Sequence, residues 1–331
     1  MKKRTVAIVA GGYSSEHDVS LRSAAGLLSF MDKEKYDCYI VDLERDGWTA
    51  LYGDERCDVD KNDFSFVASD GRHAFDFAYI TIHGTPGEDG VLQGYFDMIG
   101  MPYSTSGVLV EALTFNKFAL NNFLRAQADF HVSPSFLFRK GEALPAAEDI
   151  VAALGLPCFV KPNAGGSSFG VTKVKDVAGV YPAIEKAWME SDEVMVEKLM
   201  TGTEVTCGAY LKGGEIVTFP ITEVVTTQEF FDYDAKYNGK VDEITPARIA
   251  PETAQRVSET TKKIYRLLGC YGIIRVDYIL DGKPGEEAID LLEVNTTPGM
   301  TATSFIPQQV RAAGLDIADV LSDIIEGRLA S

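Results

Sequence analysis

Four polar side chains stand at alternate positions of two nearby segments: Asp277, Glu293 and Asn295 could bind a metal ion, and the Arg275 guanidinium would lie beside them. Two carboxylates and an amide oxygen suit a hard cation such as Mg²⁺, which commonly bridges protein carboxylates to substrate phosphates. The alternative is a solvated polar face on an edge hairpin. The apolar residues that alternate with these four disfavour it, because buried charges are normally paired or bound to metal.

A β-hairpin would bring these four side chains together. The segments Ile273–Ile279 and Leu291–Thr303 each have the character of a strand, and the turn-rich residues 281–285 join them. Successive side chains of a strand point to opposite faces, so each strand places its two polar residues on one face. Folding the chain about Gly285 then sets Asp277 almost opposite Glu293.

A second segment could bind phosphate. In Val160–Val171 (VKPNAGGSSFGV) a strand ends in Lys161, and a Gly/Ser loop leads into the next strand. Such a loop can offer backbone N–H donors to phosphate, with the lysine as a nearby charge. Neither G-x-x-x-x-G-K-[ST] nor a G-x-G-x-x-G after a strand occurs in the chain. A flexible hairpin tip remains the alternative interpretation of this loop.

Bulk properties limit the possible partners and the compartment. The chain has 331 residues and a net charge of −18 without a basic tract, which disfavours a nucleic-acid partner. The five scattered cysteines form no metal-binding or C-x-x-C pattern, which favours free thiols in a reducing compartment. No apolar run has the length of a membrane span. We therefore expect a soluble, cytoplasmic protein with two or three domains.

The elements that must position these residues fall into three predicted parts. Residues 1–105 alternate short strands (5–10, 39–43 and 75–82) with helices (19–30 and 89–98), which predicts an α/β domain with a parallel sheet. Residues 106–190 begin with a long helix over 109–127 and continue as a small α+β subdomain that holds the Gly/Ser loop. Residues 191–331 form a second α+β subdomain with the hairpin, a helix over 253–268 and a terminal helix over 317–327. The polar, aromatic stretch 222–245 has little periodicity, which is typical of a lid.

The motifs together resemble one family. The R-x-D…E-x-N hairpin, the Gly/Ser loop and the strand end Glu197-Lys198 are similar to those of the ATP-grasp superfamily, in which ATP lies between two α+β subdomains. Further segments, in the family's order along nearly the whole chain, resemble the D-alanine–D-alanine ligases: Gly11–Ser20 (GGYSSEHDVS), His83–Gly90 (HGTPGEDG), Leu92–Gly94 (LQG), Pro102-Tyr103, Tyr233–Tyr237 (YDAKY) and Glu293–Thr301 (EVNTTPGMT).

The resemblance implies a reaction and its cofactors. ATP phosphorylates the carboxylate of one D-alanine, and the amine of a second D-alanine attacks the acyl phosphate. Phosphate is expelled, and the product, D-alanyl-D-alanine, is used for peptidoglycan synthesis. Asp277, Glu293 and Asn295 match the ligands of Mg²⁺ or Mn²⁺, with two ions expected. Arg275 and the backbone N–H of Gly299 match the groups that stabilise the developing oxyanion.

The resemblance also assigns the nucleotide site. Lys117 and Lys161 match lysines that contact phosphate, although Lys117 on its predicted helix could equally be a solvated side chain. Glu197 matches the acceptor for the adenine amino group, and Glu204 matches the carboxylate that binds ribose. The backbone around Leu199 lines the base, and that position is often aromatic in the family. The backbone residues assigned to the base are Lys198 and Met200.

The substrate sites come from the resemblance as well. Glu16 matches the residue that binds the ammonium of the first D-alanine; its alternative is a carboxylate at a helix N-terminus. His83 matches a residue that orients the second substrate, although a lone histidine is more often structural. Ser304 and the backbone of Phe305, often leucine in the family, match the site for the second carboxylate.

Three further residues belong to the lid and to the Gly/Ser loop. Lys236 would reach the terminal phosphate of ATP when the lid closes. Tyr237 would bond to Ser167 and Glu16, and its presence favours an amine acceptor over D-lactate. Phe231 stands where the family commonly has tyrosine.

Several functions remain open at this point. The chain could use D-serine or D-lactate as the acceptor, could ligate another carboxylate to another amine, or could be a nucleotide sensor that has lost catalysis. The intact Arg275 disfavours a sensor, which needs no oxyanion clamp. The resemblance also implies a homodimer.

Overall fold

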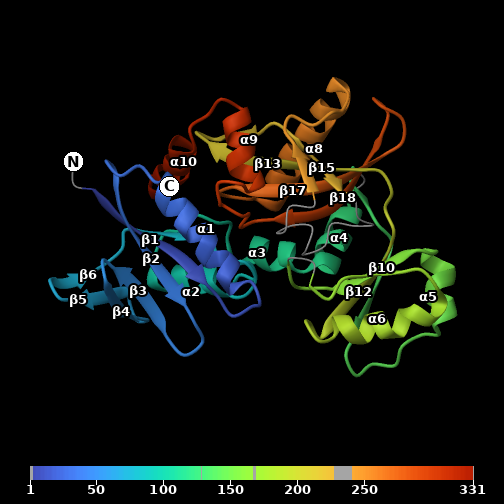
Figure 1. The fold of residues 1–331 in the computed structure, drawn as a ribbon, viewed down its shortest axis with the longest axis horizontal. Coiled ribbons are helices and arrows are strands. Elements are labelled where there is room, and N and C mark those ends of the chain that lie inside the picture. Colours follow the sequence, from blue (N-terminus) through green and yellow to red (C-terminus); the bar gives the residue numbers. More distant parts are fainter. Residues whose placement is uncertain (1–2, 128, 167–168, 227–240, 331) are drawn as a thin grey trace.

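The N-terminal part of the chain forms a seven-stranded sheet in the order β6-β5-β4-β3-β2-β1-β7. The computed structural model describes residues 3–127, 129–166, 169–226 and 241–330. The strands are β1 (Arg4–Gly11), β2 (Tyr36–Leu43), β3 (Trp48–Tyr52), β4 (Glu55–Asp60), β5 (Ser65–Ala68), β6 (Gly71–His73) and β7 (Phe77–Ile80). Helices α1 (His17–Phe30) and α2 (Val91–Ile99) accompany them (Figure 1).

Only part of this sheet is parallel. Strand β1 pairs in parallel with β2 and β7, as predicted, whereas β3 to β6 extend the sheet antiparallel. The sequence prediction contained no strands between residues 48 and 73. These strands are short, and in β4 only Cys57 and Val59 are buried between charged neighbours. One-sided burial over so few residues leaves a weak periodic signal.

Two helices, not one, lead out of this domain. The predicted helix over 109–127 is divided into α3 (Val108–Phe115) and α4 (Lys117–Arg125). At the break, Asn116 has φ −87° and ψ 95°, and its side chain accepts a hydrogen bond from the backbone N–H of Ala119. Asparagine is a favoured N-cap because it satisfies such a donor, so the break starts a new helix at Lys117.

A four-stranded antiparallel sheet follows, in the order β11-β10-β12-β9. Its elements are β9 (Ser135–Arg139), α5 (Ala147–Leu154), β10 (Cys158–Pro162), β11 (Thr172–Val174), the 3₁₀ turn η1 (Val177–Gly179), α6 (Val180–Ala187) and β12 (Glu193–Lys198). Helices α5 and α6 pack on this sheet through one apolar core, in which Ile150 and Ile184 meet Val160. The Gly/Ser loop connects β10 to β11.

The C-terminal sheet has the order β16-β15-β13-β17-β18-β8, with β14 paired to β13. Its strands are β8 (His131–Val132), β13 (Thr203–Lys212), β14 (Glu215–Thr218), β15 (Thr222–Thr226), β16 (Val241–Ile244), β17 (Ile274–Asp281) and β18 (Ala288–Asn295), and its helices are α8 (Pro251–Leu268), α9 (Phe305–Ala312) and α10 (Ile317–Leu329). Helix α9 was not predicted. The predicted irregular stretch 222–245 is wrong at both ends, because β15 and β16 pair antiparallel.

The C-terminal helices fasten the N-terminal sheet to the hairpin. One apolar core combines Ile8 and Tyr79 of the first sheet with Ile306 of α9 and Ile324 of α10. The first and last parts of the chain therefore share a core, which fixes the N-terminal sheet relative to β17 and β18. Among the described residues, none of the helices has the length and apolarity that a membrane crossing needs.

Candidate active site

The predicted hairpin face is confirmed. In the β17–β18 pair, Asp277 lies opposite Glu293 and Arg275 lies opposite Asn295. The Arg275 guanidinium donates two hydrogen bonds to the Asp277 carboxylate, at 2.9 and 2.8 Å. Asn295 Nδ2 donates to the same carboxylate at 3.1 Å. Burial opposes the charge on Arg275, but the Asp277 carboxylate holds the arginine's pKa above its ordinary value.

The donor set on this face fits a hard cation. Asp277 is buried, and Arg275 also lies 3.9 Å from Glu293 Oε1. Two carboxylates therefore share one guanidinium, which leaves these three side chains with a net negative charge, buried at Asp277 and partly exposed at Glu293. A buried excess of carboxylate oxygen is expected to take up a cation, and oxygen ligands of this kind suit Mg²⁺ or Mn²⁺.

The loop after β18 folds back over the hairpin. Gly299 packs against Ser304, since a Cβ at Gly299 would lie 3.0 Å from Ser304 Oγ. Ser304 Oγ in turn accepts a hydrogen bond from the Thr301 backbone at 3.1 Å. The Arg275 guanidinium lies over the Phe305 ring, 5.3 Å from its centroid. The structure thus brings the predicted residues of the oxyanion site and of the second carboxylate site to one place.

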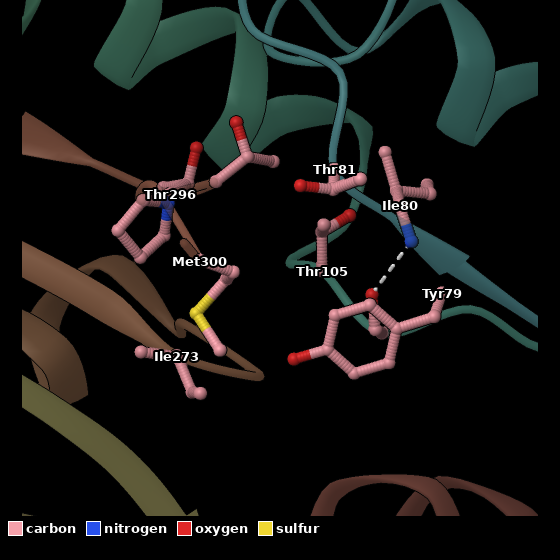
Figure 2. A pocket seen from close by; sticks show the side chains of 10 residues that line it. Tyr79, Ile80, Thr81, Thr105, Ile273, Thr296 and Met300 are labelled. Atoms are coloured by element: carbon pink, nitrogen blue, oxygen red, sulfur yellow. Dashed lines mark hydrogen bonds between the residues drawn. The ribbon is translucent and has the colours of Figure 1, made fainter. Parts of the chain in front are cut away.

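The N-terminal sheet presses against this loop. A cavity of only about 20 Å³ separates Thr81 and Thr105 on one side from Thr296 and Met300 on the other (Figure 2). The Thr297 hydroxyl crosses the boundary and donates to the Ile82 carbonyl at 3.1 Å. The loop that carries Gly299 is therefore fixed by the segment around Ser304 on one side and by the N-terminal domain on the other.

His83 is tied to the same loop through Ser23, a residue that the sequence did not point to. Ser23 Oγ lies 3.1 Å from His83 Nε2 and accepts from the Met300 backbone N–H at 3.4 Å. The backbone N–H of His83 donates to Ser20 Oγ at 2.9 Å. Because α1 carries both serines, it sets the histidine's position relative to the loop.

Glu16, just before α1, reaches the Gly/Ser loop from the opposite side. Its side chain is buried, and a Cβ at Gly166 would lie 2.5 Å from its Oε2. The carboxylate therefore lies directly against the backbone of the loop at Gly166. This placement brings the predicted first-substrate residue next to the predicted phosphate loop.

Two lysines flank the loop. Lys117, at the start of α4, donates from Nζ to the Gly165 carbonyl at 2.6 Å, so it is not a solvated side chain. Burial lowers the pKa of Lys117, an effect that the nearby Glu293 opposes. Lys161 Nζ lies 2.6 Å from Glu197 Oε1, and both side chains are buried on the central sheet. In such a buried pair, the lysine could donate to an anionic ligand and the glutamate could accept a hydrogen bond from it.

The comparisons with known proteins agree with the geometry. Two family models, described as the N-terminus and the C-terminus of D-ala D-ala ligase, match residues 5–106 and 124–326. The chain belongs to the D-alanine–D-alanine ligase family. It is 60% identical to the D-alanine–D-alanine ligase of Phocaeicola vulgatus and 62% identical to that of Bacteroides fragilis, in each case over 98% of this chain and 99% of the relative.

Solved structures of such ligases have the same fold. The VanG D-Ala:D-Ser ligase of Enterococcus faecalis matches with a TM-score of 0.84 at 31% identity, covering 98% of this chain and 99% of that one. The D-alanine–D-alanine ligase of Bacillus anthracis in complex with ATP matches with a TM-score of 0.77 at 29% identity, covering 99% and 98%. These matches establish the ATP-grasp architecture that the hairpin, the Gly/Ser loop and the strand end Glu197-Lys198 predicted.

The remaining residues that the ligase family assigns to adenine and ribose lie at the end of β12 and in the segment that follows it. The Lys198 N–H donates to Pro134 O at 3.0 Å, and its carbonyl accepts from Ser133 Oγ at 2.7 Å. A contact of that carbonyl with the base would use its second lone pair. Met200 follows in the connection to β13, and Glu204 lies on β13 opposite Ile279.

Some ligase-family assignments lie outside the described residues: Ser167, Lys236 and Tyr237. One acidic residue, by contrast, had no assigned role although it belongs to the His83–Gly90 motif. Glu88 is close enough to Glu16 and Lys117 for both charges to act on its pKa, and its position depends on contacts between distant segments that no local pattern encodes.

Proposed function

We propose that this chain joins two D-alanine molecules at the expense of ATP, giving D-alanyl-D-alanine, ADP and phosphate. The observation that supports this most directly is the β17–β18 face, where Asp277, Glu293 and Asn295 converge beside Arg275 and the Gly299 loop. The residues that we assign to the phosphate-binding centre and to the oxyanion site therefore adjoin, as a reaction through an acyl phosphate requires. The high identity to named D-alanine–D-alanine ligases supports the same substrates.

The first step transfers the terminal phosphoryl group of ATP to the carboxylate of one D-alanine. Lys117 and Lys161 would hold the phosphates, with Lys236 joining from the lid. Glu197, Glu204 and the backbone at Lys198 and Met200 would hold the adenosine. Asp277, Glu293 and Asn295 would hold Mg²⁺ or Mn²⁺, and the bound cation would neutralise charge on the phosphates.

The second step forms the peptide bond. Glu16, with Ser167 and Tyr237, would fix the first D-alanine by its ammonium, while Ser304 and the Phe305 backbone would bind the carboxylate of the second. His83 would orient that second substrate.

The free amine of the second D-alanine attacks the acyl carbon, and the resulting tetrahedral intermediate expels phosphate. Arg275 and the Gly299 N–H would stabilise the oxyanion, and such preorganised donors often supply the largest catalytic term.

A phosphate-release assay tests the proposal. The enzyme, ATP and Mg²⁺ should release phosphate at a rate that rises with D-alanine, and EDTA should abolish the release. ATP binding without release that depends on D-alanine would indicate a sensor instead. D-Serine and D-lactate are the second candidate acceptors, since the D-Ala:D-Ser ligase of E. faecalis has the same fold.

The same proposal includes three statements about organisation. The chain would work in the cytoplasm, where ATP is available. Residues 1–105, 106–190 and 191–331 would act as three units, with the lid between β15 and β16.

The third statement is that two copies of the chain form a homodimer. Met98 and Leu109 are 89% and 77% exposed where α2 meets α3. Asp97 is the sole charged residue in positions 90–110, and Glu111, the next residue, is buried. On a chain of net charge −18, this apolar surface carries only one exposed carboxylate, Asp97, so a second copy would meet little repulsion there. Light scattering should give a dimer mass for the wild type and a monomer mass for Met98→Glu. A monomeric wild type would contradict the proposal.

A further inference from the structure

Glu88 joins the two loops on which the substrates would meet. Its Oε2 accepts a hydrogen bond from the Gly84 backbone N–H at 2.7 Å, immediately after His83. The Thr297 hydroxyl, which donates to the Ile82 carbonyl, also lies near the Glu88 carboxylate, and Glu88 and Thr296 line one cavity. One side chain therefore bonds to the segment of His83 and lies against the loop that leads to Gly299.

The charged groups around Glu88 come from every element packed on it. Glu16 before α1 repels it, and Lys117 on α4 attracts it. The charge of Glu88 also raises the pKa of Glu111 on α3 and of Arg275 on β17. Glu88 shares a cavity of about 30 Å³ with Lys117 and Glu293, so its carboxylate borders the centre of the site.

This position is costly for a carboxylate. Burial, and then the charge of Glu16, raise the pKa of Glu88 to about 7. A neutral side chain of the same shape would fit the folded chain at lower free energy. Carboxylates in unfavourable surroundings inside a cleft are commonly held there for function.

We propose that Glu88 is a positioning residue that locks the His83 segment to the Gly299 loop, so that the acceptor amine and the oxyanion donors keep one relative placement during acyl transfer. The proposal rests on the ligase function given above. Gly84 shows how tightly this segment is packed, since a Cβ there would lie 2.7 Å from Ser14 Oγ. The link between the loops runs through two side chains that lie near each other: Glu88 is bonded to the Gly84 N–H, and Thr297 is bonded to the Ile82 carbonyl.

Two variants separate positioning from simple folding. Glu88→Gln keeps an oxygen for the Gly84 N–H but replaces the other carboxylate oxygen by an amide nitrogen beside Thr297, whereas Glu88→Ala removes both atoms. We expect kcat/KM for D-alanine to fall about tenfold in Glu88→Gln and about a hundredfold or more in Glu88→Ala. Affinity for a non-hydrolysable ATP analogue, measured by calorimetry, should stay within about twofold, and Tm at pH 8 should not fall in Glu88→Gln.

A double-mutant cycle tests the link itself. Thr297→Val combined with Glu88→Gln should lose less activity than the product of the single losses, because both remove the same contact. Glu286→Gln, an exposed glutamate in the β17–β18 turn, is the matched control and should behave as the wild type.

Three results would overturn the proposal. They are unchanged kcat/KM in both Glu88 variants, a parallel loss of ATP-analogue affinity and Tm in Glu88→Gln, or fully additive losses in the cycle. A wild type with no turnover that depends on D-alanine would instead overturn the ligase function, and this inference with it.

Discussion

Replacing Arg275 should stop turnover while nucleotide binding survives. Its guanidinium makes two hydrogen bonds to Asp277 and lies over the Phe305 ring, with a side chain only 12% exposed. Loss of one preorganised oxyanion donor costs about 3–4 kcal/mol in the transition state, or roughly 10²–10³ in kcat. Arg275→Ala also leaves the buried Asp277 carboxylate without its partner. A cation at the site would offset part of that cost, so the Tm loss should be smaller in saturating Mg²⁺–ATP.

The assay is phosphate release with saturating D-alanine, set beside calorimetric binding of an ATP analogue. Arg275→Lys should recover little activity, because a point charge cannot reproduce the planar pair of donors that faces Asp277. Arg72→Ala removes an exposed arginine that pairs with Asp63 at the far edge of the N-terminal sheet, and it should leave both measurements unchanged. Equal losses of ATP-analogue affinity and kcat in Arg275→Ala would refute the oxyanion role.

Three further predictions follow from contacts within the site. Gly166→Ala would place a Cβ 2.5 Å from Glu16 Oε2, so KM for D-alanine should rise at least about tenfold; an unchanged KM would show that Glu16 does not bind this substrate. Lys161→Ala leaves Glu197 buried without its partner, so Tm should fall and KM for ATP should rise together, and a rise in KM alone would contradict the paired geometry. Because the pKa of Glu88 is about 7 when folded and ordinarily 4.5, the folded chain binds the extra proton, and wild-type stability should decline as pH rises through that window. Glu88→Gln removes this penalty of about 1–2 kcal/mol after allowance for partial exposure, so urea unfolding should show a gain at pH 8 and none at pH 4.5.

The hairpin face was predictable because it depends on local rules. Strand alternation places Arg275 with Asp277 and Glu293 with Asn295, and the turn sets the register that puts Asp277 opposite Glu293. The bulge after Asp277 lies beyond these four residues and leaves the face intact. The cap at Asn116 also follows a local rule, since asparagine commonly precedes the first residue of a helix. The break was missed because the apolar residues on both sides of Asn116 fit one continuous helix.

The contacts that complete the site were not predictable, because they join residues far apart in the sequence. Ser23 meets both His83 and Met300, and the latter lies 277 positions away. Glu88 meets Thr297 only because helices α9 and α10 pack the N-terminal sheet against the last loop. Such placements follow from the packing of whole elements, whereas sequence patterns report mainly which face of one element is buried.

Product analysis by mass spectrometry tests the central claim most directly. The purified chain is incubated with D-alanine, ATP and Mg²⁺, in competition with D-serine or D-lactate, while ADP and phosphate are quantified. The account predicts D-alanyl-D-alanine as the main product at neutral pH, with one ADP and one phosphate for each dipeptide. ATP hydrolysis without dipeptide, or a depsipeptide as the sole product, would contradict it.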